Sequence, residues 1–386
     1  MKIIYLIAGT YRPGGMERVL AGKVNWLCGH GVADVLVVTT DQCGRKPFFT
    51  FVPGVKSVDL DIGYEENNGG SFMNKALRYP LKQLKHYFRL KRLLMRERAD
   101  FVVSMFCNDA SFVPLIKDGS QKVLEIHFSR YKRLQYARRG LWAIADRWRY
   151  RNDKKVASRY SRFVVLTEED RGYWEQDGTM PNIRVIPNAR TFPPTENKVD
   201  RDGCHVVLAV GRYNVQKAFD RMIDVWSIVC RKYGDVVSEG NWILRIVGDG
   251  ELREELRKRI GELDVSGSVV LGNAETDIRS VYDSAGIYAM TSLYEGLPMV
   301  LLEAQASGLP IVAMACKCGP KDVVTDGVDG FLVPEGDKDS MARKLAELMA
   351  DSDLREKMGK NAVIASGRYD EDSVMEKWVN LFGKRL

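Results

Sequence analysis

Residues 291–310 read TSLYEGLPMVLLEAQASGLP and lie between two short apolar runs, IYAM (287–290) and IVAM (311–314). Both runs have the length and composition of buried strands. Pro298 suits the first turn of a helix and Gly308 suits the position just past its last turn, so a helix is predicted from Pro298 to Ser307. A strand, a helix and another strand in so short a stretch indicate a parallel α/β sheet.

The same alternation continues toward both ends of the chain. The predicted strands before residue 187 are KIIYLIA, DVLVVTT, VKSVDL, FVVSM, KVLEIH, RFVVLT and IRVIP, and those after residue 203 are HVVLAV, WILRIVG, SVVLG, IYAMT, IVAMA and GFLVP. Helical patterns follow at about 337–366. The predicted fold class is therefore α/β, with two parallel sheets.

The segment PNARTFPPTENKVDRDG (187–203) separates the two groups of strands and has no apolar periodicity. A chain of 386 residues suits two domains. We expect one domain at 1–187, a linker at 188–203, a second domain at 204–369 and a final helix at about 370–386. Two such domains leave a cleft at the carboxyl ends of their strands, where open α/β sheets bind ligands.

The composition is that of a globular protein, with 45% hydrophobic and 28% charged residues. The N-terminal apolar run is shorter than a signal-peptide core, and no run reaches the length of a membrane span, which predicts a cytoplasmic protein. The seven cysteines are scattered and the four histidines are not clustered, which argues against a disulfide framework or a metal site.

Positive charge is concentrated in the first half of the chain. Residues 75–98 hold nine Lys and Arg against one acid, and residues 129–162 hold twelve against two. Aromatic residues such as Phe88 and Trp148 are interleaved with them. This pattern fits an anionic membrane surface or a phosphate-bearing substrate, and it also fits helical faces that are simply solvated.

The predicted helix start at Pro298 offers backbone amides, those of Leu297, Met299 and Val300, to an anion such as a diphosphate. Glu303 lies about 8 Å further along the axis, which could match a ribose attached to that diphosphate. Glu295, in the preceding loop, could accept hydroxyl groups of a sugar on the other side. The alternative is a solvated loop glutamate and a helix glutamate in a salt bridge.

Other loops after strands hold further candidates. Arg212 and Lys217 bracket the turn that begins at Gly211, and two cations beside a helix start can neutralise a diphosphate, although either could be surface decoration. Gly15, near the start of a helix expected at about Met16, lets a backbone approach a ligand, or only forms a tight turn. His127 closes a strand and could bind substrate or be structural. Weaker signals are Gly248 in VGDGE (247–251) and Ala274 in LGNAETDI (271–278).

Taken together, these residues resemble the retaining glycosyltransferases of family 4, which have the GT-B architecture of two facing Rossmann-like domains. The resemblance rests on Glu295 and Glu303 as the E-x7-E pair, and on the motifs VGRYNVQKAFD (210–220), GGMERVL (14–20) and DGVDGFLVPEGD (326–337). It covers essentially the whole chain. Ala218 stands where the family usually has glycine.

The resemblance implies a nucleotide-diphosphate sugar donor held by residues 205–335, an acceptor held by residues 1–187, and a final helix that crosses back onto the first domain. It implies retention at the anomeric carbon and chemistry without a metal or other cofactor. The catalytic candidates are Glu295, Lys217, Arg212 and His127. The donor-binding candidates are Gly15, Gly211, Arg212, Lys217, Gly248, Ala274, Glu295, Gly296, Leu297, Met299, Val300 and Glu303.

The predicted function is transfer of a hexose or N-acetylhexosamine, with a UDP-sugar favoured as donor, to a saccharide acceptor in surface polysaccharide or glycan assembly. The basic segments favour a lipid-linked acceptor and peripheral contact with the inner face of the cell membrane. A sugar-nucleotide epimerase of the same architecture, or a non-catalytic sugar-nucleotide-binding protein, would share most of these residues. A nicotinamide dehydrogenase would need the absent G-x-G-x-x-G fingerprint, and no nucleic-acid-binding motif is found.

Overall fold

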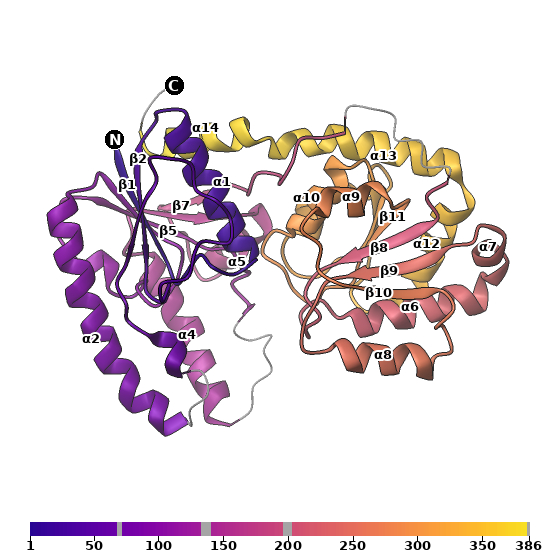
Figure 1. Cartoon of the computed structure of the whole chain (residues 1–386), viewed down its shortest axis with the longest axis horizontal. Coiled ribbons are helices and arrows are strands. Elements are labelled where there is room, and N and C mark those ends of the chain that lie inside the picture. The colour runs from indigo at the N-terminus through magenta and orange to yellow at the C-terminus, as the bar shows by residue number, and fades with distance from the viewer. Residues whose placement is uncertain (68–71, 133–139, 196–202, 384–386) are drawn as a thin grey trace. The chain divides into compact units, whose positions relative to one another are not determined.

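The computed structural model describes residues 1–67, 72–132, 140–195 and 203–383. Its contacts divide the chain into two compact units: an amino-terminal unit of Met1–Pro187 with Val374–Leu386, and a carboxy-terminal unit of Asn188–Ser373. Each unit holds one parallel sheet flanked by helices (Figure 1). The α/β fold class is therefore confirmed, and every predicted strand is present.

The amino-terminal sheet has seven parallel strands in the order β3-β2-β1-β4-β5-β6-β7. Its central strands are apolar on both faces because helices cover both faces, as is usual for parallel sheets. The order reverses between β1 and β4, so the loops after these two strands diverge and leave room at the carboxyl edge. The strands are β1 (Lys2–Ile7), β2 (Asp34–Thr39), β3 (Lys56–Asp59), β4 (Phe101–Ser104), β5 (Gln121–Glu125), β6 (Arg162–Val165) and β7 (Ile183–Val185).

The helices of this unit connect its strands, and the end of the chain adds one more. They are α1 (Gly15–Gly29), α2 (Phe72–Glu97), α4 (Leu141–Ala157), α5 (Glu168–Glu175) and α14 (Glu371–Leu381), with short 3₁₀ turns η1 (Tyr64–Asn67) and η2 (Val113–Leu115). From Val374 onward α14 belongs to the amino-terminal unit. None of the helices in the described ranges has the length and apolar character that crossing a membrane requires.

The carboxy-terminal sheet has six parallel strands in the order β10-β9-β8-β11-β12-β13. Here the order reverses between β8 and β11, which makes the loops after these strands the expected ligand position. The strands are β8 (Val206–Val210), β9 (Ile243–Val247), β10 (Val269–Gly272), β11 (Ile287–Met290), β12 (Ile311–Met314) and β13 (Gly330–Val333).

The helices of the carboxy-terminal unit complete its layers. They are α6 (Phe219–Lys232), α7 (Gly234–Glu239), α8 (Arg253–Glu262), α9 (Ile278–Asp283), α10 (Met299–Ala306), α11 (Pro320–Val323), α12 (Lys338–Ala350), α13 (Ser352–Ser366) and the 3₁₀ turn η3 (Gly367–Tyr369). The helical pattern predicted at 337–366 thus forms two helices. Asp351 separates them, and its carboxylate accepts a hydrogen bond from the amide of Leu354 at 2.9 Å.

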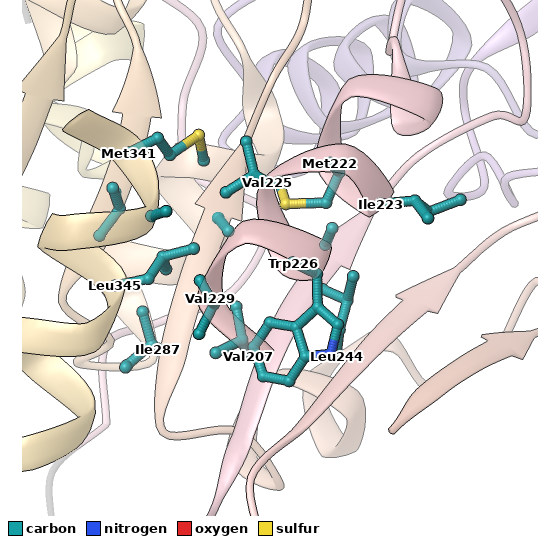
Figure 2. Close-up of a cluster of buried hydrophobic side chains, with 14 of the residues drawn as sticks. Val207, Met222, Ile223, Val225, Trp226, Val229, Leu244, Ile287, Met341 and Leu345 are labelled. Carbon is teal, nitrogen blue, oxygen red and sulfur yellow. The ribbon is translucent and has the colours of Figure 1, made fainter. Parts of the chain in front are cut away.

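The core of this unit is built around α6, whose apolar side chains recur at helical spacing. The strand side chains that α6 faces include Val207, Leu244 and Ile287, and the α6 side chains that face them are Met222, Val225, Trp226 and Val229 (Figure 2). Helix α12 adds Met341 and Leu345 from another side. All of these side chains are buried. The packed core holds the strand ends, and therefore the loops after them, in fixed positions.

Local backbone explains where helix starts differ from the sequence-based prediction. The helix after the turn at Gly211 begins only at Phe219, because Ala218 has left-handed backbone angles (φ 48°, ψ 50°). This conformation accounts for the glycine usual at that position in the family. Pro298 precedes α10 as its N-cap instead of being its first residue. Of the predicted linker, residues 196–202 lie outside the described residues.

Candidate functional site

Two loops of the carboxy-terminal unit meet where its strand order reverses. One loop follows β8 and the other follows β11, and these strands are hydrogen-bonded neighbours. The amide of Leu293 donates to the carbonyl of Gln216 at 2.8 Å, and the hydroxyl of Thr291 donates to the carbonyl of Ala218 at 3.0 Å. The two loops therefore form one structure and not two independent segments.

An ion pair joins Lys217 of the loop after β8 to Glu295 of the loop after β11. Lys217 Nζ lies 2.7 Å from Glu295 Oε1, and their side chains are 16% and 8% exposed. Gln216 Nε2 donates to the carbonyl of Tyr294 at 3.0 Å. Gly211 packs against the stem of Lys217, because a Cβ at Gly211 would lie 2.9 Å from Lys217 Cε. The ammonium has further N–H donors and the carboxylate further acceptor sites, so the pair can still bind a polar ligand.

The second glutamate, Glu303, is buried on α10 and both of its carboxylate oxygens accept hydrogen bonds. Thr191 Oγ1 donates to Oε1 at 2.7 Å, and the hydroxyl of Tyr282 donates to Oε2 at 2.8 Å. These two partners orient the carboxylate. The sequence did not reveal either partner. Thr191 lies in the segment predicted to be a linker, and a buried tyrosine in a helix is usually a core residue.

The start of α10 lies between the two glutamates. Pro298 has an extended backbone, and its own side chain makes no capping hydrogen bond. Gly296, Leu297, Met299 and Val300 are buried or half-buried around this start. The loop after β12 closes against it: Gly319 has φ +98°, and a Cβ there would lie 2.3 Å from Pro298 Cδ. Backbone amides at such a start attract an anion.

The remaining candidates of this unit lie around the two loops with different surroundings. The side chain of Arg212 is exposed. Gly248 is required by packing, since a Cβ there would lie 1.9 Å from the carbonyl oxygen of Gly211. Ala274 is exposed in the loop after β10. Within the described ranges, no three His, Cys, Asp or Glu side chains are grouped as metal ligands would be.

Two candidates belong to the amino-terminal unit. Gly15 is the first residue of α1, and a Cβ there would have no neighbour within 4 Å. His127 lies just after β5 with its side chain only 7% exposed, and its Nε2 is 3.0 Å from Glu125 Oε1. The imidazole is thus turned toward a buried carboxylate, which sequence reasoning did not single out.

Comparison with known sequences matches the chain in two regions. Residues 14–189 match the family described as "Glycosyl transferase 4-like domain", and residues 195–363 match "Glycosyl transferases group 1". These regions fall in the two units and include all of the candidate residues.

Curated relatives include proteins that match along their whole length. An uncharacterized glycosyltransferase of Haemophilus influenzae is 29% identical over 378 residues, 98% of each chain. The amylovoran biosynthesis glycosyltransferase AmsD of Erwinia amylovora is 35% identical over 223 residues, 56% of this chain and 60% of that protein. An undecaprenol-diphosphate-linked glycan N-acetyl-D-galactosaminyltransferase of Campylobacter jejuni is 24% identical over 388 residues, 100% of this chain and 99% of that protein.

Solved structures share the fold along the whole chain. Sucrose-phosphate synthase of Thermosynechococcus elongatus superposes with a TM-score of 0.81 at 18% identity, covering 99% of this chain and 98% of that one. HepE of Anabaena, solved with UDP and glucose, superposes with a TM-score of 0.74 at 18% identity, covering 99% of each chain. Because the two family matches together cover residues 14–189 and 195–363, the chain belongs to the family 4 glycosyltransferases of GT-B fold and is a transferase enzyme.

Proposed function

We propose that the enzyme is a retaining glycosyltransferase that moves a hexose or an N-acetylhexosamine from a UDP-sugar to a saccharide acceptor. The observation that carries this proposal is the Lys217–Glu295 pair at 2.7 Å, beside the start of α10. A cation, a sugar-hydroxyl acceptor and helix-start amides within two joined loops suit a nucleotide-diphosphate sugar. The fold shared with HepE, which was solved with UDP and glucose, supports the choice of donor.

Each candidate then has a separate role on the donor. The diphosphate would lie against the start of α10, with Lys217 and the exposed Arg212 neutralising its charge. Glu303, oriented by Thr191 and Tyr282, would accept the ribose hydroxyls. Glu295, oriented by Lys217, would accept hydroxyls of the transferred sugar. Because the two cations supply the positive charge, the reaction would need no metal ion.

The proposed step is a displacement on the face that the diphosphate leaves. The acceptor oxygen forms a bond to the anomeric carbon while the bond from that carbon to the phosphate oxygen breaks, and the phosphate keeps the electron pair. The acceptor proton passes to the departing phosphate. Because the acceptor enters on the face that the diphosphate leaves, the configuration is retained. The protein contributes orientation and stabilises the developing negative charge.

For the acceptor, we propose a lipid-linked saccharide of surface polysaccharide or glycan assembly. Two relatives support this class, since one is named for amylovoran biosynthesis and the other for transfer to an undecaprenol-diphosphate-linked glycan. An acceptor of this kind is held at a membrane, so the enzyme would have to reach the bilayer surface.

The outer face of α2 has the chemistry for such contact. Leu81, Leu84, Phe88 and Met95 are each at least half exposed and recur at a spacing of three, four and seven residues, which puts them on one helical face. We call these four residues the α2 stripe. Exposed basic residues adjoin it, namely Lys85, Lys91 and Arg92. Helix α2 is long (Figure 1), and its apolar stripe with basic flanks suits an anionic bilayer surface.

The membrane contact is tested by flotation with vesicles of neutral lipid, with and without anionic lipid. We expect the protein to float with anionic vesicles, and the double variant Leu84→Glu with Phe88→Glu to lose this property. Ile364→Glu is the matched control, because Ile364 is an exposed apolar residue of the carboxy-terminal unit. Flotation that ignores lipid charge, or that survives the double substitution, would contradict the proposal.

The donor and the reaction are tested in two steps. A thermal-shift panel of UDP-, GDP- and ADP-sugars identifies the donor, and NMR of the product then reports the anomeric configuration. Lys217→Ala should raise the transfer barrier by about 3 to 4 kcal/mol, the effect of losing one charge-stabilising group. Glu303→Ala should also suppress transfer strongly. Lys258→Ala, at an exposed lysine on α8, should leave transfer unchanged.

Three outcomes would refute parts of this proposal. An inverted anomeric configuration would exclude the retaining mechanism, and a donor interconverted without any acceptor would point to an epimerase. Loss of transfer after treatment with EDTA would show that a metal ion is needed.

A further inference from the structure

A buried cluster in the amino-terminal unit surrounds His127. It consists of Tyr5 on β1, Lys23 on α1, Glu125 on β5, His127 after β5 and Trp378 on α14. Lys23 is a buried lysine, and its ammonium donates a hydrogen bond to Glu125 Oε1. The same ammonium lies 3.7 Å from the centre of the Trp378 ring and 5.9 Å from that of Tyr5.

The two carboxylate oxygens of Glu125 have different contacts within this cluster. Oε1 accepts from Lys23 and also lies 3.0 Å from His127 Nε2, off the line of a straight hydrogen bond. Oε2 has no hydrogen-bond partner among the described residues, and neither has the hydroxyl of Tyr5. The oxygen bonded to Lys23 is therefore the one that faces the imidazole.

The charges of the cluster are costly for stability. Burial alone would raise the pKa of Glu125, but the interactions of its carboxylate with Lys23 and His127 outweigh it and lower that pKa to about 2. Burial lowers the pKa of Lys23, and Glu125 opposes that shift. We take the Lys23–Glu125 pair as ionised, because the two groups are in direct contact. Apolar side chains of similar volume often stabilise a core at least as well as a buried ion pair does, so stability is a weak reason for this pair.

We propose that Glu125 is a positioning residue for His127, and that Lys23, held against Trp378, fixes Glu125. This inference rests on the proposed function in one respect, namely that His127 is used in transfer. The geometry behind it is a continuous set of contacts from Trp378 through Lys23 and Glu125 to His127. The helix at the end of the chain would thereby act on a residue that follows β5.

The chain offers a matched control for this cluster. Lys122 is a second buried lysine, on the same strand as Glu125, and it pairs with Asp118. Their side chains are 7% and 1% exposed, against 5% and 1% for Lys23 and Glu125. Lys122→Met thus removes a buried ion pair of the same kind without touching His127.

The first test measures the NMR signals of the His127 ring in the whole protein, with labelled histidine. Only four histidines are present, and His127→Gln identifies the signals. We expect Glu125→Gln and Lys23→Met to move the His127 ring signals and Lys122→Met to leave them in place. Trp378→Phe, which keeps an aromatic ring and should fold, should move them less. The proposal would be overturned if the His127 ring signals stayed in place in Trp378→Phe and also in each of Glu125→Gln and Lys23→Met that folds.

The second test reads transfer, with KM for the nucleotide sugar and kcat measured separately. We expect Glu125→Gln to lower kcat by about 10- to 100-fold, as loss of a partner that orients a functional histidine does, with little change in KM. Equal losses in Glu125→Gln and Lys122→Met would show a structural role and overturn the proposal. Absence of transfer in the parent protein would refute the proposed function instead, and the ring signals would still decide the positioning.

Discussion

Asp109 is a buried carboxyl group of the amino-terminal unit, and its Oδ2 has no hydrogen-bond partner among the described residues. Burial raises the pKa of Asp109 to about 6, against the opposing effect of the Ser104 hydroxyl. Because folding raises this pKa, the protonated form is favoured. The stability that this group contributes is fully present below its ordinary pKa of 3.8 and is lost as the pH rises through about 6.

Asp109→Asn should therefore stabilise the protein at pH 8 by about 3 kcal/mol and change little at pH 4. Urea unfolding at both pH values measures the difference. Asp41→Asn is the control, because Asp41 is equally buried but accepts hydrogen bonds from the Thr40 hydroxyl at 2.6 Å and the Glu65 amide at 3.0 Å. An equal gain for Asp109→Asn at both pH values would contradict the assignment of the effect to ionisation.

Gly15 allows a steric test of the first loop. A Cβ there has no protein neighbour within 4 Å, and alanine is the better helix former, so Gly15→Ala should leave stability unchanged or raise it by up to about 1 kcal/mol. If a substrate approaches this backbone, the added methyl group should raise KM for that substrate. Unchanged kinetics together with unchanged stability would remove Gly15 from the set of ligand-binding candidates.

Part of the candidate site could be predicted from the sequence, for a physical reason. Lys217 and Glu295 follow strands of one sheet, and loops at the carboxyl edge meet where the strand order reverses. Glu125 could also have been predicted from the sequence. It stands two residues before His127, and alternation along a predicted strand puts both residues on one side. Thr191 and Lys23 could not be predicted, because only the folded chain brings them to Glu303 and Glu125.

At the scale of elements, the strands were predictable and the helix boundaries were less so. Apolar runs such as VVLAV and IVAM predict buried parallel strands directly. Helices cover both faces of such a sheet, so nearly every residue of its central strands is apolar. The start of α6 depends on a single left-handed residue, Ala218, which apolar periodicity does not reveal. Pro298 was placed one residue too far inside α10 for a similar reason, since its backbone is extended.

Helix α6 carries the core of the carboxy-terminal unit, and Trp226 is its largest buried side chain. Trp226→Ala should destabilise this unit by about 3–5 kcal/mol, because it leaves a cavity and also removes the hydrogen bond from Trp226 Nε1 to Ser268 Oγ at 2.9 Å. Chemical unfolding measures the loss. Trp148→Ala on α4 is the control: its side chain is exposed, so the change should stay within about 0.5 kcal/mol. Similar losses in the two variants would contradict this account of the core.

At the scale of the whole molecule, the amino-terminal unit is made from two pieces of chain that are far apart in sequence. Val374–Leu386 belongs with Met1–Pro187 although the whole carboxy-terminal unit lies between them in the chain. Apolar periodicity predicts a helix at the end of the chain but not where that helix packs. The expectation that it returns to the first domain came from the resemblance to a family and not from the residues themselves.

The amino-terminal unit should therefore need its last helix. Residues 1–187 alone should unfold at a lower urea concentration than the same residues joined to 371–386 by a flexible linker. The reason is that α14 buries Val374, Met375, Trp378 and Val379, and that the ring centre of Phe382 lies 4.8 Å from that of Phe101. Burial of each large apolar side chain is worth roughly 1.5–3 kcal/mol, less the cost of ordering the helix. In the linked chain Trp378→Ala should cancel most of the gain, while Glu376→Ala at an exposed position should keep it. Equal midpoints with and without residues 371–386 would mean that the sheet and its own helices already form a complete core.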